Sequence, residues 1–470
     1  MSSASAPPQA QAIPVNDRRE IFGWMMYDWA NSTFSTTVAG ALLAPYLTAL
    51  AQAAVGENGV VLSLGPLGAV TAKSFFPLCI SLSVFLQVFM LPILGAIADY
   101  SNLKKRLMAF FCYLGVVATC LLFFIAGNAY LWGGLLFIVA NLSFGAAIVL
   151  YNAFLPEICT EDQADKVSSR GFAMGYLGGG LLLAANFALL TFADRLGISG
   201  GMAVRLSLLS AGIWWGGFAL ITFARLRSRA AARRLPAGQT YLTIGFTQLR
   251  ETFRELARLP HTLRYLVGYL FYNDGIQTVI GLASVFLSQE LFTDQQRAAG
   301  DDQRFVLMIF LMVQFAAMVG ALIFERIASV VGTKRAIILS LVLWSGVVIY
   351  AYGFLQTTTQ AWFMAAVIAL VLGGSQALSR SLFSRMIPAG REASFFGIYE
   401  ISERGTSWIG PFIFGVVVGS TGSYRDAILS LIVLFVLGMI ILATTNTDQA
   451  VHDAGNFLPE EVHPDAQPAA

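Results

Sequence analysis

The sequence predicts an all-α polytopic membrane protein with twelve transmembrane helices arranged in two pseudo-symmetric six-helix bundles. Three observations lead to this prediction. Hydrophobic residues make up 57% of the 470-residue chain and charged residues only 12%, a balance typical of membrane proteins and not of soluble domains. Twelve apolar stretches approach the length of about 20 residues that a helix needs to cross a bilayer. A rare polar motif also occurs once in each half of the chain.

The expected elements follow one another in a simple order. A disordered cytoplasmic tail over 1–20 precedes a first bundle over 21–225 and a cytoplasmic linker over 226–261. A second bundle covers 262–444, and a second disordered cytoplasmic tail, rich in Ala, Pro and acidic residues, covers 445–470. The expected spans are 21–47, 73–98, 106–127, 130–156, 169–193, 204–225, 262–288, 304–325, 335–356, 361–387, 394–420 and 424–444.

The repeated motif joins the two halves. The first copy runs from Gly23 to Asp28 and the second from Gly268 to Asp274, so that Tyr27 aligns with Tyr272 and Asp28 with Asn273. An ionisable side chain inside a membrane span costs several kcal/mol and usually marks a functional site. Its recurrence at matching positions is typical of a transporter built from duplicated bundles.

The distribution of basic residues predicts the orientation. Of the 29 Lys and Arg residues, 21 fall on the side of the N-terminus, 6 fall on the opposite side, and Arg380 and Arg404 lie within spans. Because Lys and Arg concentrate in cytoplasmic loops, we expect both termini to be cytoplasmic. The expected location is the inner membrane of a bacterial cell.

The linker 226–261 is the longest polar break, and it separates six spans from six. Between Leu242 and Leu256 apolar residues recur every three or four positions, while arginines line another face. This spacing predicts an amphipathic helix on the inner membrane surface. A helix that docks a partner protein is the alternative.

A second motif follows the second span. Gly95 and Asp99 precede a basic cluster that ends at Arg106. A carboxylate at a helix C-terminus faces the negative end of the helix dipole, so it needs a nearby cation, which Arg106 and its neighbours can supply. Here the chain resembles the major facilitator superfamily, and that resemblance implies a gating role for Gly95, Asp99 and Arg106. Charge that only sets the topology is the alternative.

A narrower resemblance covers most of the chain. The stretches Tyr27–Ser32, Tyr151–Glu157 and Phe395–Glu400 are similar to motifs of the vacuole-effluxer-like branch, which includes the autophagy-related vacuolar amino-acid effluxers of fungi and their bacterial relatives. This resemblance implies transport of small polar solutes, amino acids among them, with export as the direction.

Polar residues within the spans lie on the cytoplasmic side of centre and must face one another or water. Glu400 and Arg404 have the spacing of a helical ion pair. Arg380 is expected at a similar depth on the neighbouring span, and so to pair with Glu403. These residues provide three candidate groups. The substrate-binding candidates are Tyr27, Asn31, Asn152, Asn273, Gln277, Gln376 and Arg380. The proton-coupling candidates are Asp28 and Asp274. The gating candidates are Glu400, Glu403 and Arg404, together with Gly95, Asp99 and Arg106 of the second motif. An acid and a base together would suit a zwitterion.

Other functional classes fit the sequence less well. We expect no enzyme. The stretch Gly197–Gly201 fits the nucleophile-elbow pattern of a serine hydrolase, but it lies in an outer loop, and no histidine is expected on that side to act as the base. We also expect no cofactor, no metal site and no nucleic-acid partner, and the absence of a phosphate-binding loop leaves protons or another ion to supply energy. A scaffold or sensor on the same fold, a channel, and a transporter of drugs or other metabolites are the alternatives to a small-solute transporter.

Overall fold

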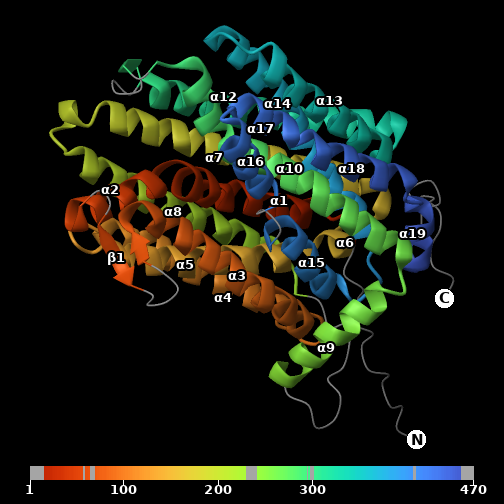
Figure 1. The fold of residues 1–470 in the computed structure, drawn as a ribbon. Helices are drawn as coiled ribbons and strands as arrows, with labels where there is room; N and C mark the ends of the chain where they lie inside the picture. The colour runs from red at the N-terminus through yellow and green to blue at the C-terminus, as the bar shows by residue number, and fades with distance from the viewer. Residues whose placement is uncertain are drawn as a thin grey trace, which may run out of the picture.

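The structure is a computed structural model, and it describes residues 15–56, 59–63, 69–228, 241–293, 295–296, 301–405 and 409–456. Eleven helices in these ranges are long and apolar enough to cross a membrane. They lie side by side as one bundle, with the N-terminal half in red to yellow and the C-terminal half in green to blue (Figure 1). The predicted all-α polytopic membrane fold is therefore confirmed.

The first half contains five long helical spans beyond the first one. The first span is formed by α1 (Arg18–Thr33), the π-helical segment η1 (Phe34–Leu42) and α2 (Leu43–Val55). An antiparallel pair of short strands, β1 (Val60–Ser63) and β2 (Ala69–Thr71), leads into the next helix. The later elements are α3 (Ala72–Asp99), α4 (Lys104–Leu121), η3 (Leu122–Phe124), α5 (Tyr130–Asn152), α6 (Leu155–Ile158), α7 (Glu161–Thr191), η4 (Asp194–Leu196) and α8 (Gly200–Arg225).

The second half follows the linker helix α9 (Tyr241–Leu256). Its first four spans are α10 (Pro260–Leu291), α12 (Asp301–Val331), α13 (Thr333–Gly353) and α14 (Thr358–Arg385). The expected span 394–420 is divided among α15 (Glu392–Glu400), the π-helical segment η5 (Ile401–Gly405) and α16 (Ile409–Thr421), and residues 406–408 lie outside the described ranges. The chain then forms α17 (Tyr424–Ser430), α18 (Ile432–Thr444) and α19 (Thr447–Asp453).

Local sequence explains where several helices begin. The Asp17 carboxylate accepts a hydrogen bond from the backbone N–H of Arg19 at 2.8 Å and caps α1. That bond lowers the pKa of the Asp17 carboxyl below its ordinary value. Pro260 occupies the first turn of α10, where its missing N–H costs nothing. Gly332 has a φ of 90° between α12 and α13, a conformation that favours glycine.

The bundle has apolar side chains on its outside and polar side chains within. Phe124, Trp132 and Phe363 are among the exposed aromatic residues, whereas Asp28, Asn152 and Arg380 are buried. This distribution suits helices that face lipid, because lipid solvates apolar side chains and leaves polar ones to find partners inside.

Two ends of the bundle are distinguished below. The end of the bundle that carries α19 is called the inner end, and the opposite end, which carries the β1–β2 strands, is called the outer end (Figure 1). The two halves meet where α7 packs against α12 and α14, and where α3 packs against α15.

Two expectations about the polar segments need correction. The segment 445–470, expected to be disordered, begins with α19, because Asn446 caps this helix and Ala450 and Val451 are buried. The expected amphipathic helix coincides with α9, but Gln248 and Thr252 of α9 are buried against protein, a contact that the amphipathic pattern did not predict. The tail residues 1–14 and 457–470 lie outside the described ranges.

Candidate functional site

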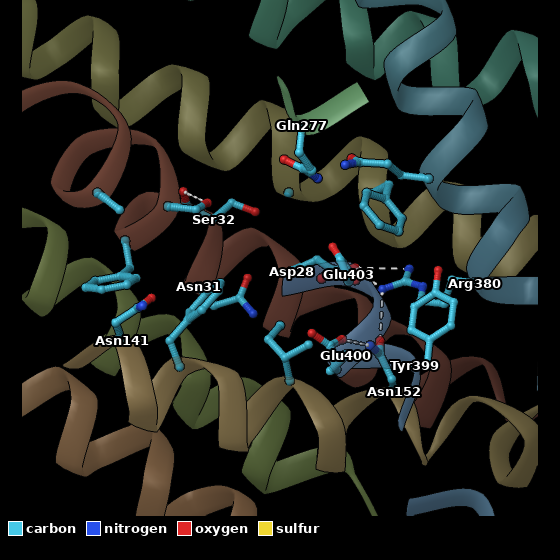
Figure 2. A pocket seen from close by; sticks show the side chains of 18 of the residues that line it. Asp28, Asn31, Ser32, Asn141, Asn152, Gln277, Arg380, Tyr399, Glu400 and Glu403 are labelled. Carbon is cyan, nitrogen blue, oxygen red and sulfur yellow. Dashed lines mark hydrogen bonds and ion pairs between the residues drawn. The ribbon is translucent and has the colours of Figure 1, made fainter. Parts of the chain in front are cut away.

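A cavity of about 400 Å³ lies between the two halves. Its walls come from α1, η1, α3, α5 and α7 in the first half and from α10, α14, α15 and η5 in the second. Of the predicted site residues, the cavity is lined by Asp28, Asn31, Asn152, Gln277, Gln376, Arg380, Glu400 and Glu403. Figure 2 shows these side chains around the cavity.

An ion pair between the halves forms one wall of this cavity. Two nitrogens of Arg380 on α14 each lie 3.3 Å from Oδ2 of Asp28 on α1. The hydroxyl of Tyr151 donates to the same oxygen at 2.7 Å. Asp28 and Arg380 are 7% and 4% exposed, so water screens their attraction weakly.

Arg380 is fully engaged by the first half. Besides Asp28, it donates to the hydroxyl and the carbonyl of Ser168 at 2.9 Å each and to Oδ1 of Asn152 at 3.4 Å. These five hydrogen bonds match the number of N–H groups on a guanidinium. The guanidinium carbon also lies 4.2 Å from the ring centre of Phe172 and 4.8 Å from that of Trp24. In this conformation Arg380 therefore joins the halves and has no N–H left for a substrate carboxylate.

One of the two pairings predicted for the span-eleven acids differs from the structure, and the other is not described. Glu400 accepts a hydrogen bond from Nδ2 of Asn152 at 3.0 Å, across the interface between the halves (Figure 2). Arg380 pairs with Asp28 and not with Glu403, although Glu403 does line the cavity. The side chain of Arg404 lies outside the described part of the structure, so the expected pair of Glu400 with Arg404 is not described.

Further contacts between the halves close the inner end. The Asp165 carboxylate on α7 accepts hydrogen bonds from Ser381, from Thr333 at 2.5 Å and from Arg385 at 3.1 Å. All three donors belong to the second half. Because these contacts lie between the cavity and the inner surface, the inner end is closed in this structure. The cavity extends toward the outer end, where Ala39, Val84 and Asn141 line it.

The motif at Gly95 and Asp99 contributes to the same closure. The Asp99 carboxylate accepts hydrogen bonds from the backbone N–H of Ala393 at 3.0 Å and of Ser394 at 2.9 Å, at the start of α15. A side chain at Gly95 would collide with the carbonyl of Ala393, so glycine allows α3 and α15 to approach closely. This carboxylate thus satisfies the first turn of a helix from the other half.

The cation expected beside Asp99 is a different residue. Arg106 is exposed, and no hydrogen bond or ion pair joins it to another described residue. Lys104 instead forms an ion pair with Glu157 at 2.5 Å and is the cation that stabilises the charge of Asp99. The reason is geometric, because Lys104 begins α4 beside the turn whereas Arg106 points away two residues later.

Three of the substrate-binding and proton-coupling candidates lie away from the cavity lining. Tyr27 is buried within the first half, with its ring 5.1 Å from that of Tyr151. Asn273 donates to the backbone carbonyl of Glu403 at 3.2 Å, and Asp274 accepts from the backbone N–H of Gly410 at 2.6 Å. The first copy of the repeated motif therefore reaches the cavity through Asp28, and Asn31 follows three residues later. The second copy reaches it through Tyr269, and Gln277 follows three residues after Asp274.

Sequence reasoning also missed several residues that line the cavity or contact its lining. Tyr151 holds Asp28, Ser168 holds Arg380, and the hydroxyl of Tyr176 donates to Gln376 at 2.9 Å. Tyr269 and Tyr399 contribute a stacked pair of rings with centres 4.4 Å apart. Tyr151 could have been found, since it directly precedes Asn152 in a motif already singled out.

Comparisons with known proteins agree with this architecture. Chains of similar fold include the transporter FucP of the major facilitator superfamily in the outward conformation, with a TM-score of 0.64, 11% identity and coverage of 91% of this chain and 98% of FucP. The human organic anion transporter MFSD10 has a TM-score of 0.65, with 15% identity and coverage of 90% and 99%. The chain thus has the fold of the major facilitator superfamily transporters, with a cavity between its two halves.

Sequence comparisons identify the branch. The family model described as "Vacuole effluxer Atg22 like" matches residues 16–455. An uncharacterized MFS-type transporter, YxiO of Bacillus subtilis, is 31% identical over 445 residues, covering 94% of this chain and 95% of YxiO. Autophagy-related protein 22-1 of Penicillium rubens is 24% identical over 556 residues, covering 93% and 91%. The chain belongs to the Atg22-like vacuole effluxer family.

Proposed function

We propose that the protein is a secondary active transporter, and not an enzyme, that exports a small polar solute by alternating access. The observation that carries this proposal is the Asp28–Arg380 ion pair, which joins the two halves at the wall of a polar cavity. A site between two halves that is closed at one end is what alternating access requires. In this proposal the substrate enters from the inner side while the inner contacts are broken, and leaves to the outer side after they re-form.

The substrate contacts are assigned to the amide side chains of the cavity. Asn31, Gln277 and Gln376 offer both donors and acceptors, and they come from both halves of the protein. A solute bound between them would draw the halves together. Arg380 is assigned to the inner gate instead of the substrate, because its N–H groups are already occupied by the first half.

Asp28 is the proposed coupling acid. A proton on this carboxylate would remove the charge that compensates the buried guanidinium of Arg380. An uncompensated buried charge is strongly unfavourable, so Arg380 would leave the first half and the inner end would open. The position of Asp28 at the cavity gives protons a path to it when the cavity faces outward. Proton movement would in this way drive the exchange between the two conformations.

The finer assignments rest on the relatives and on the charge distribution. The family description "vacuole effluxer" supports export, and amino acids are the substrate class that the resemblance implies. The excess of basic residues at the inner end supports cytoplasmic termini in a bacterial inner membrane.

Transport by the purified protein in liposomes tests the proposal. Saturable counterflow of a labelled amino acid is the expected result. A pool of amines and other small metabolites is tested after the amino acids. A protein that acts as a scaffold or sensor would move none of them. A channel would give flux that neither saturates nor shows counterflow.

A further inference from the structure

The linker helix α9 is fixed to the rest of the protein by one face. Gln248, Thr252 and Leu256 of this face are buried and follow one another at intervals of one helical turn. Arg391, which precedes α15, donates to Oε1 of Gln248 at 2.8 Å and to Oγ1 of Thr252 at 2.7 Å. It also forms an ion pair with Glu255 at 3.0 Å, and α9 packs against α3 of the first half. These contacts fix the rotation of α9 about its own axis.

The opposite side of α9 carries a row of arginines. Arg250 and Arg254 lie on the helix, and Arg258 follows in the turn directly after it. All three side chains are exposed, and no hydrogen bond or ion pair joins their guanidinium groups to another described residue. This arginine row, Arg250, Arg254 and Arg258, therefore presents three positive charges away from the protein.

An exposed aromatic ring lies beside the arginine row. The Phe253 side chain is 50% exposed, whereas Leu256 is buried against protein. At 3.6 residues per turn, Phe253 lies about 100° from the centre of the buried face and Arg254 about 160° from it on the other side. A helix with an apolar flank beside a basic flank fits the boundary between hydrocarbon and lipid headgroups.

The position of α9 brings these two flanks to the depth of the headgroups. The membrane span α10 begins at Pro260, directly after this region, and contains 32 residues. A helix of that length measures about 48 Å, whereas the hydrocarbon core of a bilayer is about 30 Å thick. The ends of α10 therefore extend into the headgroup layers. Because α9 lies beside one of these ends, at the inner end of the bundle, it lies at the same level (Figure 1).

The charge balance of the linker matches a negatively charged surface. From Arg225 to Arg264 the sequence contains nine arginines, no lysine and two acidic residues, Glu251 and Glu255. Glu255 is already paired with Arg391. Membranes carry anionic lipids at their cytoplasmic surface, and each Lys or Arg close to such a surface strengthens binding about fivefold.

We propose that the arginine row binds the phosphate groups of anionic phospholipids in the inner leaflet. A guanidinium group donates two parallel N–H bonds to phosphate oxygens, which suits it to this contact. An acidic segment of a protein would also neutralise the arginines, but it would not provide an apolar layer for Phe253. A lipid surface accounts for both the charges and the exposed ring.

Lipid bound at the arginine row would act on both halves of the protein. On its inward side α9 contacts α3 of the first half and Arg391 of the second. Headgroups that hold α9 in place would therefore stabilise the conformation in which the inner ends of α3 and α15 are together. This consequence rests on the proposed transport function. Lipid binding itself does not, and it is measured without a transported solute.

A fluorophore beside the arginine row tests the proposal. Ala257 is exposed, and its N–H donates to the Phe253 carbonyl at 3.0 Å, so it continues the helix between Phe253 and Arg254. Ala257→Cys therefore places an environment-sensitive dye at the row in the purified full-length protein in neutral detergent. Phosphatidylglycerol should change the emission saturably, and phosphatidylcholine with the same acyl chains should not. Added NaCl should weaken the response, because salt screens exposed charges.

Replacement of the row gives the decisive comparison. Arg250→Gln, Arg254→Gln and Arg258→Gln combined should weaken the binding of phosphatidylglycerol about a hundredfold, from about fivefold for each arginine. The same three replacements by Lys keep the charges and should retain most of the binding. Arg326→Gln combined with Arg335→Gln removes two exposed cations from α12 and α13, so it should leave the dye response unchanged. The chain without Ala257→Cys, labelled in the same way, measures the background.

Three outcomes would overturn the proposal. One is an equal response to phosphatidylglycerol and phosphatidylcholine. Another is undiminished binding of phosphatidylglycerol by the triple Gln variant. The third is an equal response to soluble glycerol phosphate, because the ligand would then be a free anion and not a lipid.

Discussion

Replacement of Asp28 by Asn removes one charge from a buried ion pair and leaves the other in place. Arg380 is 4% exposed and would remain among Trp24, Tyr151 and Phe172 without a counter-charge. Breaking a buried pair in this way costs about 3–5 kcal/mol. Because Ser168 and Asn152 still accept hydrogen bonds from Arg380, we take the lower end, about 3 kcal/mol.

This cost falls on the inner-closed conformation alone. Asp28 belongs to the first half and Arg380 to the second, so the pair separates when the inner end opens. A loss of about 3 kcal/mol shifts the ratio of closed to open molecules by a factor of about 100. We therefore expect Asp28→Asn to convert most molecules to the inward-open form without unfolding them.

Distances between spin labels measure this shift directly. Labels at exposed Arg106 on α4 and exposed Ser329 on α12 report on the separation of the halves at the inner end. Cys79, Cys112 and Cys159 are buried, which limits background labelling. The variant should show a longer distance than the native chain. An unchanged distance distribution would refute the view that this ion pair holds the inner end closed.

A double variant provides the matched control. Asp28→Asn combined with Arg380→Met removes both charges, and replacing both members of a buried pair by neutral groups is often tolerated. The double variant should recover part of the inner-closed population that the single variant loses. Effects that simply add would show that the two residues are energetically independent.

Three further predictions concern other parts of the protein. Gly95→Ala should widen the same label distance, because the added methyl group costs the closed form about 1–3 kcal/mol. Gly217→Ala, where a side chain meets open space, is the control and should leave the distance unchanged. Equal effects would contradict the close-packing argument. Arg391→Ala should destabilise the docking of α9 by about 3 kcal/mol and speed proteolysis of the linker, since Arg391 is buried against Gln248, Thr252 and Glu255 of α9. Arg254→Ala, on the exposed side of α9, is the control. A reporter fused after Ala470 should be cytoplasmic, and a periplasmic signal would reverse the assigned orientation.

The sequence by itself determined the class of protein and the charged residues that line the cavity. A membrane span needs about 20 apolar residues in succession, which is a local property that a single sequence displays. Asp28, Asn152, Arg380 and Glu400 stood out for a related reason, because polar side chains inside apolar helices are costly and therefore conspicuous. The repeated motif likewise located α1 and α10, both of which line the cavity.

Only the tertiary structure decided which of these residues meet. Asp28 and Arg380 are 352 positions apart, and their pairing depends on the depth and rotation of helices from different halves. Similar depth on neighbouring spans favoured Glu403 as the partner of Arg380, yet the fold brings Asp28 there instead. Tyr27 is turned into the first half although its neighbour Asp28 reaches the cavity, because successive residues of a helix point about 100° apart. Local periodicity marks the faces of a helix, and packing between helices selects which face becomes the site.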